Sequence, residues 1–167
     1  MFPYPITKAN LSTVFLQYLG PIGFRKMKKG EVFFQPQNLI AHDEIDVMIE
    51  LQKARGVDDY YINISTRNDE LTPVDGKGWP YLLNFRINHI KGFEDYDRLN
   101  LTYDDDVNFV LMNPDELNEY LSTFFKKLQE SIYIFEKLKT KEGTISLLKD
   151  GIITTHMRES ALLHLSK

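Results

Sequence analysis

The sequence has no cysteine in 167 residues. This absence excludes a disulfide framework, a thiolate metal site, an iron–sulfur cluster and a cysteine nucleophile. The sequence also lacks an apolar run of the roughly 18 residues that a membrane span requires. Its first residues lack the basic start and apolar core of a secretory signal. We therefore expect a cytoplasmic protein that does not bind a membrane.

The usual signatures of catalysis and of cofactor binding are missing as well. There is no nucleophile elbow, no phosphate-binding glycine loop and no His-Glu-x-x-His zinc motif. His156 and His164 are eight residues apart, which on one helix separates them by about 12 Å along the axis. His156 and Glu159 have the spacing of two ligands, but solvated polar residues of a terminal helix explain them better. We expect no metal, no cofactor and no catalytic residues, and an enzyme is the less favoured class.

The composition is that of an ordinary globular domain. Hydrophobic residues make up 43% of the chain, charged residues 26%, and the formal net charge is −4. A chain of roughly 150 residues buries about 70% of the surface of its unfolded form, which is enough for a stable core without disulfide bonds or bound metal ions. These values fit neither a disordered chain nor a strongly basic nucleic-acid binder. We predict one domain over residues 1–167.

Apolar and polar residues alternate along the middle of the chain. Such alternation predicts strands with one buried face and one wet face. The short turn-like link at 55–59 favours an antiparallel hairpin. The expected strands cover residues 31–35, 44–52, 60–65, 83–88, 99–103 and 107–111.

Helical spacing of apolar residues appears on both sides of these strands. It predicts a first helix from residue 7 or 10 to 19, which Gly20 and Pro21 end. Asn113, Pro114 and Glu116 have the types and spacing of a helix start, and the apolar face that follows predicts a helix that Gly143 ends. Shorter helices are expected at 144–149 and 155–165. The order predicts an α+β fold: an N-terminal helix, an antiparallel sheet of five or six strands, and C-terminal helices packed on one face of the sheet.

The wet face of this sheet is one candidate site. Glu50, Asn63 and Arg86 all fall on polar positions of the alternation, with Asn84 or Asn88 nearby. If their strands are neighbours, these acid, amide and guanidinium groups converge, and such a mixture can recognise a small polar ligand. The alternative interpretation is a solvated antiparallel face. A small polar-ligand binder or an enzyme that uses this face is therefore our second hypothesis.

The charges are separated along the chain, and this separation gives the first hypothesis. Residues 1–30 hold five basic side chains and no acid, whereas residues 94–119 hold nine acids against Arg98 alone. A field of one sign attracts partners of the other sign, so we expect a basic protein partner and no nucleic acid. The expected contact residues are Trp79, Glu94, Asp95, Asp97, Asp104, Asp105 and Asp106. The alternative for the acidic residues is a surface that only keeps the protein in solution. The alternative for Trp79 is that its ring packs over the edge of the core. The run at 104–106 lacks the glycine and glutamate positions of a calcium loop.

Residues 23–34 resemble the GF-x-K-x-x-G-x-x-F opening of an uncharacterised family of small bacterial proteins. The strand end at 51–55 with its Gln-Lys pair, and the strand at 61–64, are similar to the family's next segments. This chain inserts residues 37–43 and has Ser65 where a glycine is usual. The resemblance implies a helix–sheet–helix fold, no established activity and no catalytic residues. Small proteins of this kind often lie beside toxin genes as candidate immunity proteins. We therefore expect a non-enzymatic, toxin-neutralising binding module. A homodimer that pairs through the sheet is a further alternative.

Overall fold

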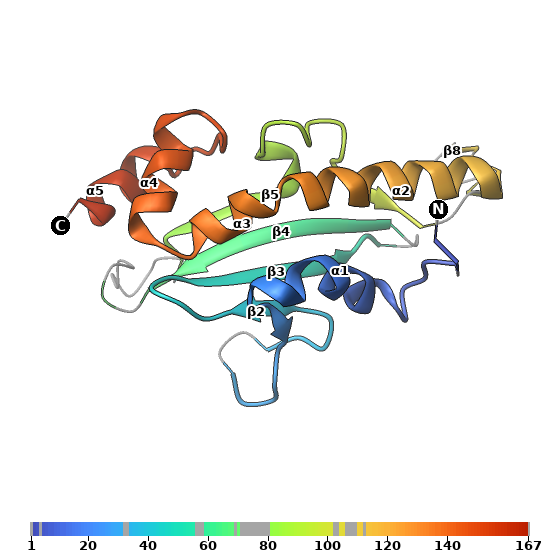
Figure 1. Ribbon diagram of the computed structural model, residues 1–167, viewed down its shortest axis with the longest axis horizontal. Coiled ribbons are helices and arrows are strands. Elements are labelled where there is room, and N and C mark those ends of the chain that lie inside the picture. Colours follow the sequence, from blue (N-terminus) through green and yellow to red (C-terminus); the bar gives the residue numbers. More distant parts are fainter. Residues whose placement is uncertain are drawn as a thin grey trace.

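A long antiparallel hairpin forms the centre of the fold (Figure 1). In the computed structural model, β3 (Asp46–Lys53) and β4 (Asp59–Arg67) pair along eight residues, as their alternation predicts. The structure describes residues 2–3, 5–31, 34–55, 59–68, 70, 81–101, 104–105, 110–111 and 113–166, with backbone alone at 104–105 and 110–111.

Shorter strands extend this hairpin on both sides. The six-stranded sheet has the order β1-β2-β3-β4-β5, and β6 also pairs with β4. Every pair is antiparallel, which confirms the predicted sheet. The added strands are β1 (Arg25–Lys26), β2 (Leu39–Ala41), β5 (Leu83–Arg86) and β6 (Leu99–Asn100). Two further short strands, β7 (Asp104–Asp105) and β8 (Val110–Leu111), pair with each other.

Helices cover one face of the sheet, so the fold is α+β as expected. Figure 1 shows α1, α2 and α3 across this face and α4 and α5 beyond the C-terminal end of α3. Their bounds are α1 (Leu11–Leu19), α2 (Pro114–Glu130), α3 (Ile132–Leu138), α4 (Lys141–Lys149) and α5 (Arg158–Leu165), with short 3₁₀ helices η1 (Gly20–Ile22) and η2 (Ile87–His89). None of the helices in the described ranges is long and apolar enough to cross a membrane.

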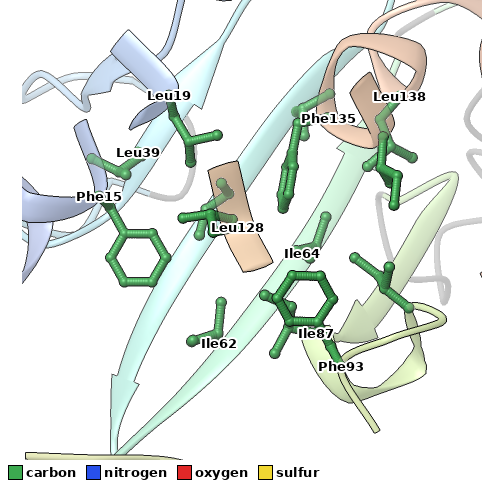
Figure 2. Close-up of a cluster of buried hydrophobic side chains, with 14 of the residues drawn as sticks. Phe15, Leu19, Leu39, Ile62, Ile64, Ile87, Phe93, Leu128, Phe135 and Leu138 are labelled. Carbon is green, nitrogen blue, oxygen red and sulfur yellow. The ribbon is translucent and has the colours of Figure 1, made fainter. Parts of the chain in front are cut away.

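The core lies between these helices and the inner face of the sheet. Figure 2 shows Phe15 and Leu19 of α1, Leu128 of α2 and Phe135 of α3 gathered over Ile62 and Ile64 of β4, all of them at most 2% exposed. The rings of Phe124 and Phe125 of α2 pack edge-on against the ring of Phe15. Burial of a side chain of this size contributes roughly 1.5–3 kcal/mol, so this layer holds the helices on the sheet.

The start of α2 agrees with the sequence prediction. The Asn113 side chain accepts a hydrogen bond from the backbone of Glu116 at 2.8 Å, and the Glu116 carboxylate accepts one from the backbone of Asn113 at 3.2 Å. Pro114 occupies the first helical position. This reciprocal pair satisfies two backbone donors that a helix start would otherwise leave free.

The predicted end of this helix at Gly143 is wrong. The chain leaves the helix at Ser131, whose φ of −107° and ψ of 13° are not helical, and α3 starts directly afterwards. A second break follows α3, where the Thr140 side chain accepts from the backbone of Gly143 and starts α4. Gly143 therefore lies in the first turn of a helix, which begins before the predicted residue 144.

The predicted strands are correct at the centre and wrong at the borders. The strand expected at 31–35 is not found in its described residues: Glu31 lies in a bend and Phe34 has no strand pairing, while residues 32–33 lie outside the described part. The flanking strands β1 and β2 take its place. β5 ends at Arg86 because η2 begins there, and β6 ends at Asn100. The strands expected at 99–103 and 107–111 fall partly, at 102–103 and 107–109, outside the described part.

Candidate functional site

Glu50, Asn63 and Arg86 lie in one row across the outer face of the sheet, the face without helices. Glu50 of β3 pairs in register with Asn63 of β4, and Asn63 pairs with Arg86 of β5. Antiparallel partners directly opposite each other have Cβ atoms about 4.5–5.5 Å apart, so the three side chains are neighbours. The structure thus brings together the three residues that the sequence singled out on this face.

The polar groups of this row bind one another or neighbouring side chains. The Asn63 Nδ2 donates to Glu50 Oε1 at 2.7 Å and to Gln52 Oε1 at 2.9 Å. The Arg86 guanidinium lies 3.9 Å from the centre of the Tyr61 ring and 3.4 Å from a carboxylate oxygen of Asp97. A ligand on this face would have to exchange with these contacts, which lowers the affinity that the row can provide.

An apolar cluster, which the sequence analysis missed, lies beside this row. The outer cluster is Met27, Phe34, Ile40, Met48 and Tyr81. Its three aliphatic members are at most 9% exposed because Phe34 and Tyr81 pack against them. Burial, with the Glu50 carboxylate nearby, raises the pKa of Tyr81. Phe34 of the loop before β2 and Tyr81 before β5 thus cover part of the outer face.

A charged cluster around Glu31 holds the loop between β1 and β2. The two Glu31 carboxylate oxygens accept from Arg25 at 2.8 and 3.0 Å, and one of them also accepts from the backbone of Lys28. His42 lies 3.3 Å from Glu31 and 2.8 Å from Asp46. The bonds from Arg25 and Lys28 lower the pKa of Glu31 to about 2. Part of the basic N-terminal charge is therefore neutralised inside the fold.

The acidic residues predicted to contact a partner fall into two groups. Glu94, Asp95 and Asp97 are exposed, on the segment before β6. Hydrogen bonds from its own backbone N–H and from that of Gly92 lower the pKa of Glu94, with Lys127 and Lys91 nearby. Asp97 faces Arg86. The other predicted contacts, which are Trp79, Asp106 and the side chains of Asp104 and Asp105, lie outside the described part of the structure.

This segment packs against the middle of α2. The Tyr96 ring lies 5.8 Å from that of Tyr120 and 5.0 Å from that of Phe124. The Tyr120 hydroxyl donates to the carbonyl of Arg98 and accepts from the backbone of Asn100. Burial raises the pKa of Tyr120 to about 12. The contact brings the acids of residues 94–97 alongside those at the start of α2.

The start of α2 carries the least compensated negative charge. Asp115, Glu116 and Glu119 are exposed, and within the described ranges none of them forms an ion pair. Together with the acids of residues 94–97 they form a surface that we call the acidic edge: Glu94, Asp95, Asp97, Asp115, Glu116 and Glu119. The basic neighbours named above lie at its far end, beside Glu94 and Asp97.

A buried carboxylate lies below this edge. Asp59, at the start of β4, is 2% exposed and lies 3.7 Å from the guanidinium of Arg98. With its amide nitrogen turned toward Asp59, Asn100 donates to both carboxylate oxygens at 3.2 Å. These contacts attach β6 to β4, so we assign Asp59 to the fold and not to a binding surface.

Hollows lined by described residues include two that lie away from the outer sheet face. An apolar groove of about 500 Å³ lies between the N-terminal segment and the start of α2. A more polar depression of about 370 Å³ lies between residues 88–94 and 151–154. Among the described residues no three His, Asp or Glu side chains are placed to hold a metal ion.

Comparison with known proteins gives no match for this chain: no family model, no curated protein and no solved structure. Its function therefore has to be argued from its own residues.

Proposed function

We propose that this chain is a non-enzymatic binding module that captures a basic protein through the acidic edge, as a toxin-neutralising protein would. One observation carries the proposal: the segment at residues 94–97 packs against α2, and this segment and the first turns of α2 together carry six exposed carboxylates. A surface of one charge accelerates encounter with a partner of the opposite charge. The proposal agrees with what the resemblance of residues 23–34 to an uncharacterised family of small bacterial proteins implies, since small proteins of this kind often lie beside toxin genes as candidate immunity proteins.

The proposal places the centre of binding nearer to α2 than the sequence suggested. Glu94 and Asp97 have basic neighbours, so part of their field is cancelled within the chain. The acids of the first turns of α2 form no ion pair among the described residues, and a basic partner would supply counter-charges. We therefore expect Asp115 and Glu119 to matter more for binding than Asp97.

The test compares two charge-neutralised variants of the whole chain. The first is Asp115→Asn with Glu119→Gln, which leaves the Glu116 cap intact. The matched control is Glu142→Gln with Glu130→Gln, which also removes one acid from a first helical turn and one acid from α2. Each variant is used to capture partners from native lysate of the source cell at low and at high salt, with identification by mass spectrometry. The captured partner is then titrated against each variant in purified form.

We expect a basic partner whose capture falls with salt and with the first variant only. Each exposed charge pair contributes roughly 0.2–1 kcal/mol, so the loss of two pairs weakens the affinity by about two- to thirty-fold. The control should keep wild-type affinity. Absence of any partner at low salt, or equal capture by both variants, would contradict the proposal.

The row of Glu50, Asn63 and Arg86 favours a second candidate function, a small polar-ligand site that could also serve an enzyme. Its support is the register that makes the three side chains neighbours. A thermal-shift screen of polar metabolites tests it, with Asn63→Ala as the variant and Thr123→Ala, on exposed α2, as the control. A stabilising compound whose effect survives Asn63→Ala would rule this site out.

A further inference from the structure

The apolar groove beside the acidic edge has a floor and walls of rigid, apolar residues. Its floor is made of Ile6, Leu101 and Leu121, all buried, and Phe2 and Leu117 form its sides. Three prolines also line it, Pro3, Pro5 and Pro114. Figure 1 shows the N-terminal end of the chain beside the start of α2. A volume of about 500 Å³ is within the range of binding sites in proteins.

The N-terminal wall of the groove is fixed by hydrogen bonds and by ring packing. The Asn10 side chain accepts from the backbone of Thr7 at 2.8 Å and donates to the carbonyl of Pro5 at 2.9 Å. The Phe2 ring lies edge-on to Phe125, with ring centres 5.5 Å apart. Little ordering is then needed when the groove is filled, which favours affinity.

The rim of the groove is acidic. Asp115 and Asn118 line it, and the carboxylates of Glu116 and Glu119 lie on the same turns of α2. An occupant needs an apolar part for the floor and positive charge at the rim. A fatty acid or another anionic lipid would bring its carboxylate or phosphate against Asp115, which Coulomb repulsion disfavours.

The basic N-terminal stretch of a second copy of this chain does not offer a suitable anchor. Its basic stretch at 25–29 contains one apolar side chain, Met27, and this side chain is only 6% exposed because it belongs to the outer cluster. This stretch of a second copy is therefore not the occupant.

We propose that this groove receives one apolar side chain of the basic partner, flanked on the partner's surface by lysine or arginine. The inference rests on the proposed function and adds to it the class of anchor that the partner must carry. A buried apolar anchor surrounded by charged contacts is the usual arrangement of a tight interface, since the anchor supplies affinity and the charges supply the rate of encounter.

The test uses two labelled peptides and the complete protein. One peptide has a phenylalanine between two pairs of lysines, and the other has serine in place of phenylalanine. Binding is measured by fluorescence anisotropy with wild type, Asp115→Asn and Asn118→Trp. The last variant places an indole at the mouth of the groove, and Thr123→Trp, at an exposed neutral position of α2, is its control.

We expect the phenylalanine peptide to bind about ten-fold more tightly than the serine peptide, because part of the ring becomes buried. Asn118→Trp should remove this difference, whereas Thr123→Trp should keep it. Asp115→Asn should weaken both peptides. In methyl NMR spectra of wild type, the phenylalanine peptide should shift the signals of Leu101, Leu117 and Leu121, a readout that needs no variant to fold.

The outcomes separate this inference from the proposed function. Equal binding of the two peptides, with both weakened by Asp115→Asn, would overturn the anchor groove and leave the acidic edge supported. Failure of both peptides to bind, or binding that Asp115→Asn does not change, would count against the groove and the acidic edge together.

Discussion

Gly143 is the residue at which a single added carbon has the largest expected effect. A Cβ atom at this position would lie 2.2 Å from the carbonyl oxygen of Lys137 and 2.7 Å from its Cα. Both atoms belong to the backbone of α3, so neither can move away as the end of a flexible side chain could. The first turn of α4 approaches the last turn of α3 this closely only because residue 143 has no side chain.

We therefore predict that Gly143→Ala lowers the free energy of unfolding by about 2–4 kcal/mol, as a backbone displacement requires. Gly20→Ala is the control, because a Cβ there meets no atom within 4 Å and its φ of −56° suits alanine. Chemical denaturation measures both changes. A loss at Gly143 no larger than that at Gly20 would contradict the contact between α3 and α4.

Glu31 makes the stability of the protein depend on acid pH. Its pKa is lowered to about 2 in the folded protein from an ordinary value of 4.5, first of all by the bond from Arg25. A carboxyl group with a lowered folded pKa stabilises the fold above its ordinary pKa, and this contribution is lost as the pH falls toward the folded value. The window for Glu31 thus runs from about pH 5 down to about pH 2.

We predict that Glu31→Gln destabilises the protein at pH 6 but has a much smaller effect near pH 2.5. Urea denaturation of wild type and variant at several pH values in this range measures the difference. Glu142→Gln serves as the control, because Glu142 is exposed and forms no ion pair within the described ranges. A difference between wild type and Glu31→Gln that stays constant with pH would disprove the assignment.

At the scale of the element, the start of α2 supports both the fold and the proposed interface. The capping pair of Asn113 and Glu116 fixes where the helix begins, and the helix start places Asp115 at the rim of the groove. Loss of an N-cap side chain costs about 1 kcal/mol. Fraying of this turn would therefore weaken binding through disorder of the rim.

We predict that Asn113→Ala lowers the free energy of unfolding by about 1 kcal/mol. Ser131→Ala is the matched control, since Ser131 stands at the N-cap of α3 and its side chain makes no capping hydrogen bond. The control should change stability by less than about 0.5 kcal/mol. Thermal and urea unfolding measure both variants, and equal losses would show that the cap adds nothing.

The sequence predicted those elements in which local pattern and tertiary packing agree. β3 and β4 alternate over their full length, and α2 has both an apolar face and a cap. β1 and β2 are too short to show a period, and they exist because β3 offers a partner to β2 and β2 in turn pairs with β1. Gly143 was interpreted as a helix end because its role, the close approach of two helices, is visible only in three dimensions.

The candidate sites follow the same rule. The row of Glu50, Asn63 and Arg86 could be predicted because alternation and hairpin register together fix which side chains are neighbours. The groove could not be predicted, since it needs the path of the N-terminal segment across the start of α2. The ion pair of Asp97 with Arg86 could not be predicted from the sequence either, because the segment between these residues has to turn before they come close in space.

At the scale of the whole molecule, the net charge of −4 is the sum of positive and negative charges that are unevenly distributed over the surface. Part of the positive charge of the basic N-terminal segment is neutralised by the ion pair of Arg25 with Glu31. The acids at the start of α2 form no ion pair among the described residues. The outer sheet face has charges of both signs beside a covered apolar cluster. A group of acids without ion pairs among the described residues thus lies at one end of α2, next to the groove.

This distribution also bears on whether two copies of the chain pair through the sheet. The outer cluster is closed over by Phe34 and Tyr81, and the exposed large hydrophobic residues of the described part, Tyr133 and Leu163, lie on α3 and α5. The edge strand β1 is two residues long, and β5 and β6 on the other side are four and two residues long. Short edges offer few backbone groups for pairing with another sheet.

We therefore predict a monomer of 19.6 kDa in light scattering at micromolar concentration, at low and at high salt. A stable interface between two proteins buries about 1,600 Å² with an apolar centre, and the described outer face offers no such centre. The variant Met48→Lys, which opens the outer cluster, provides the contrast: its exposed apolar neighbours should cause association that wild type does not show. A wild-type dimer that Asn63→Arg dissociates would instead mean that the outer face is an interface between two copies.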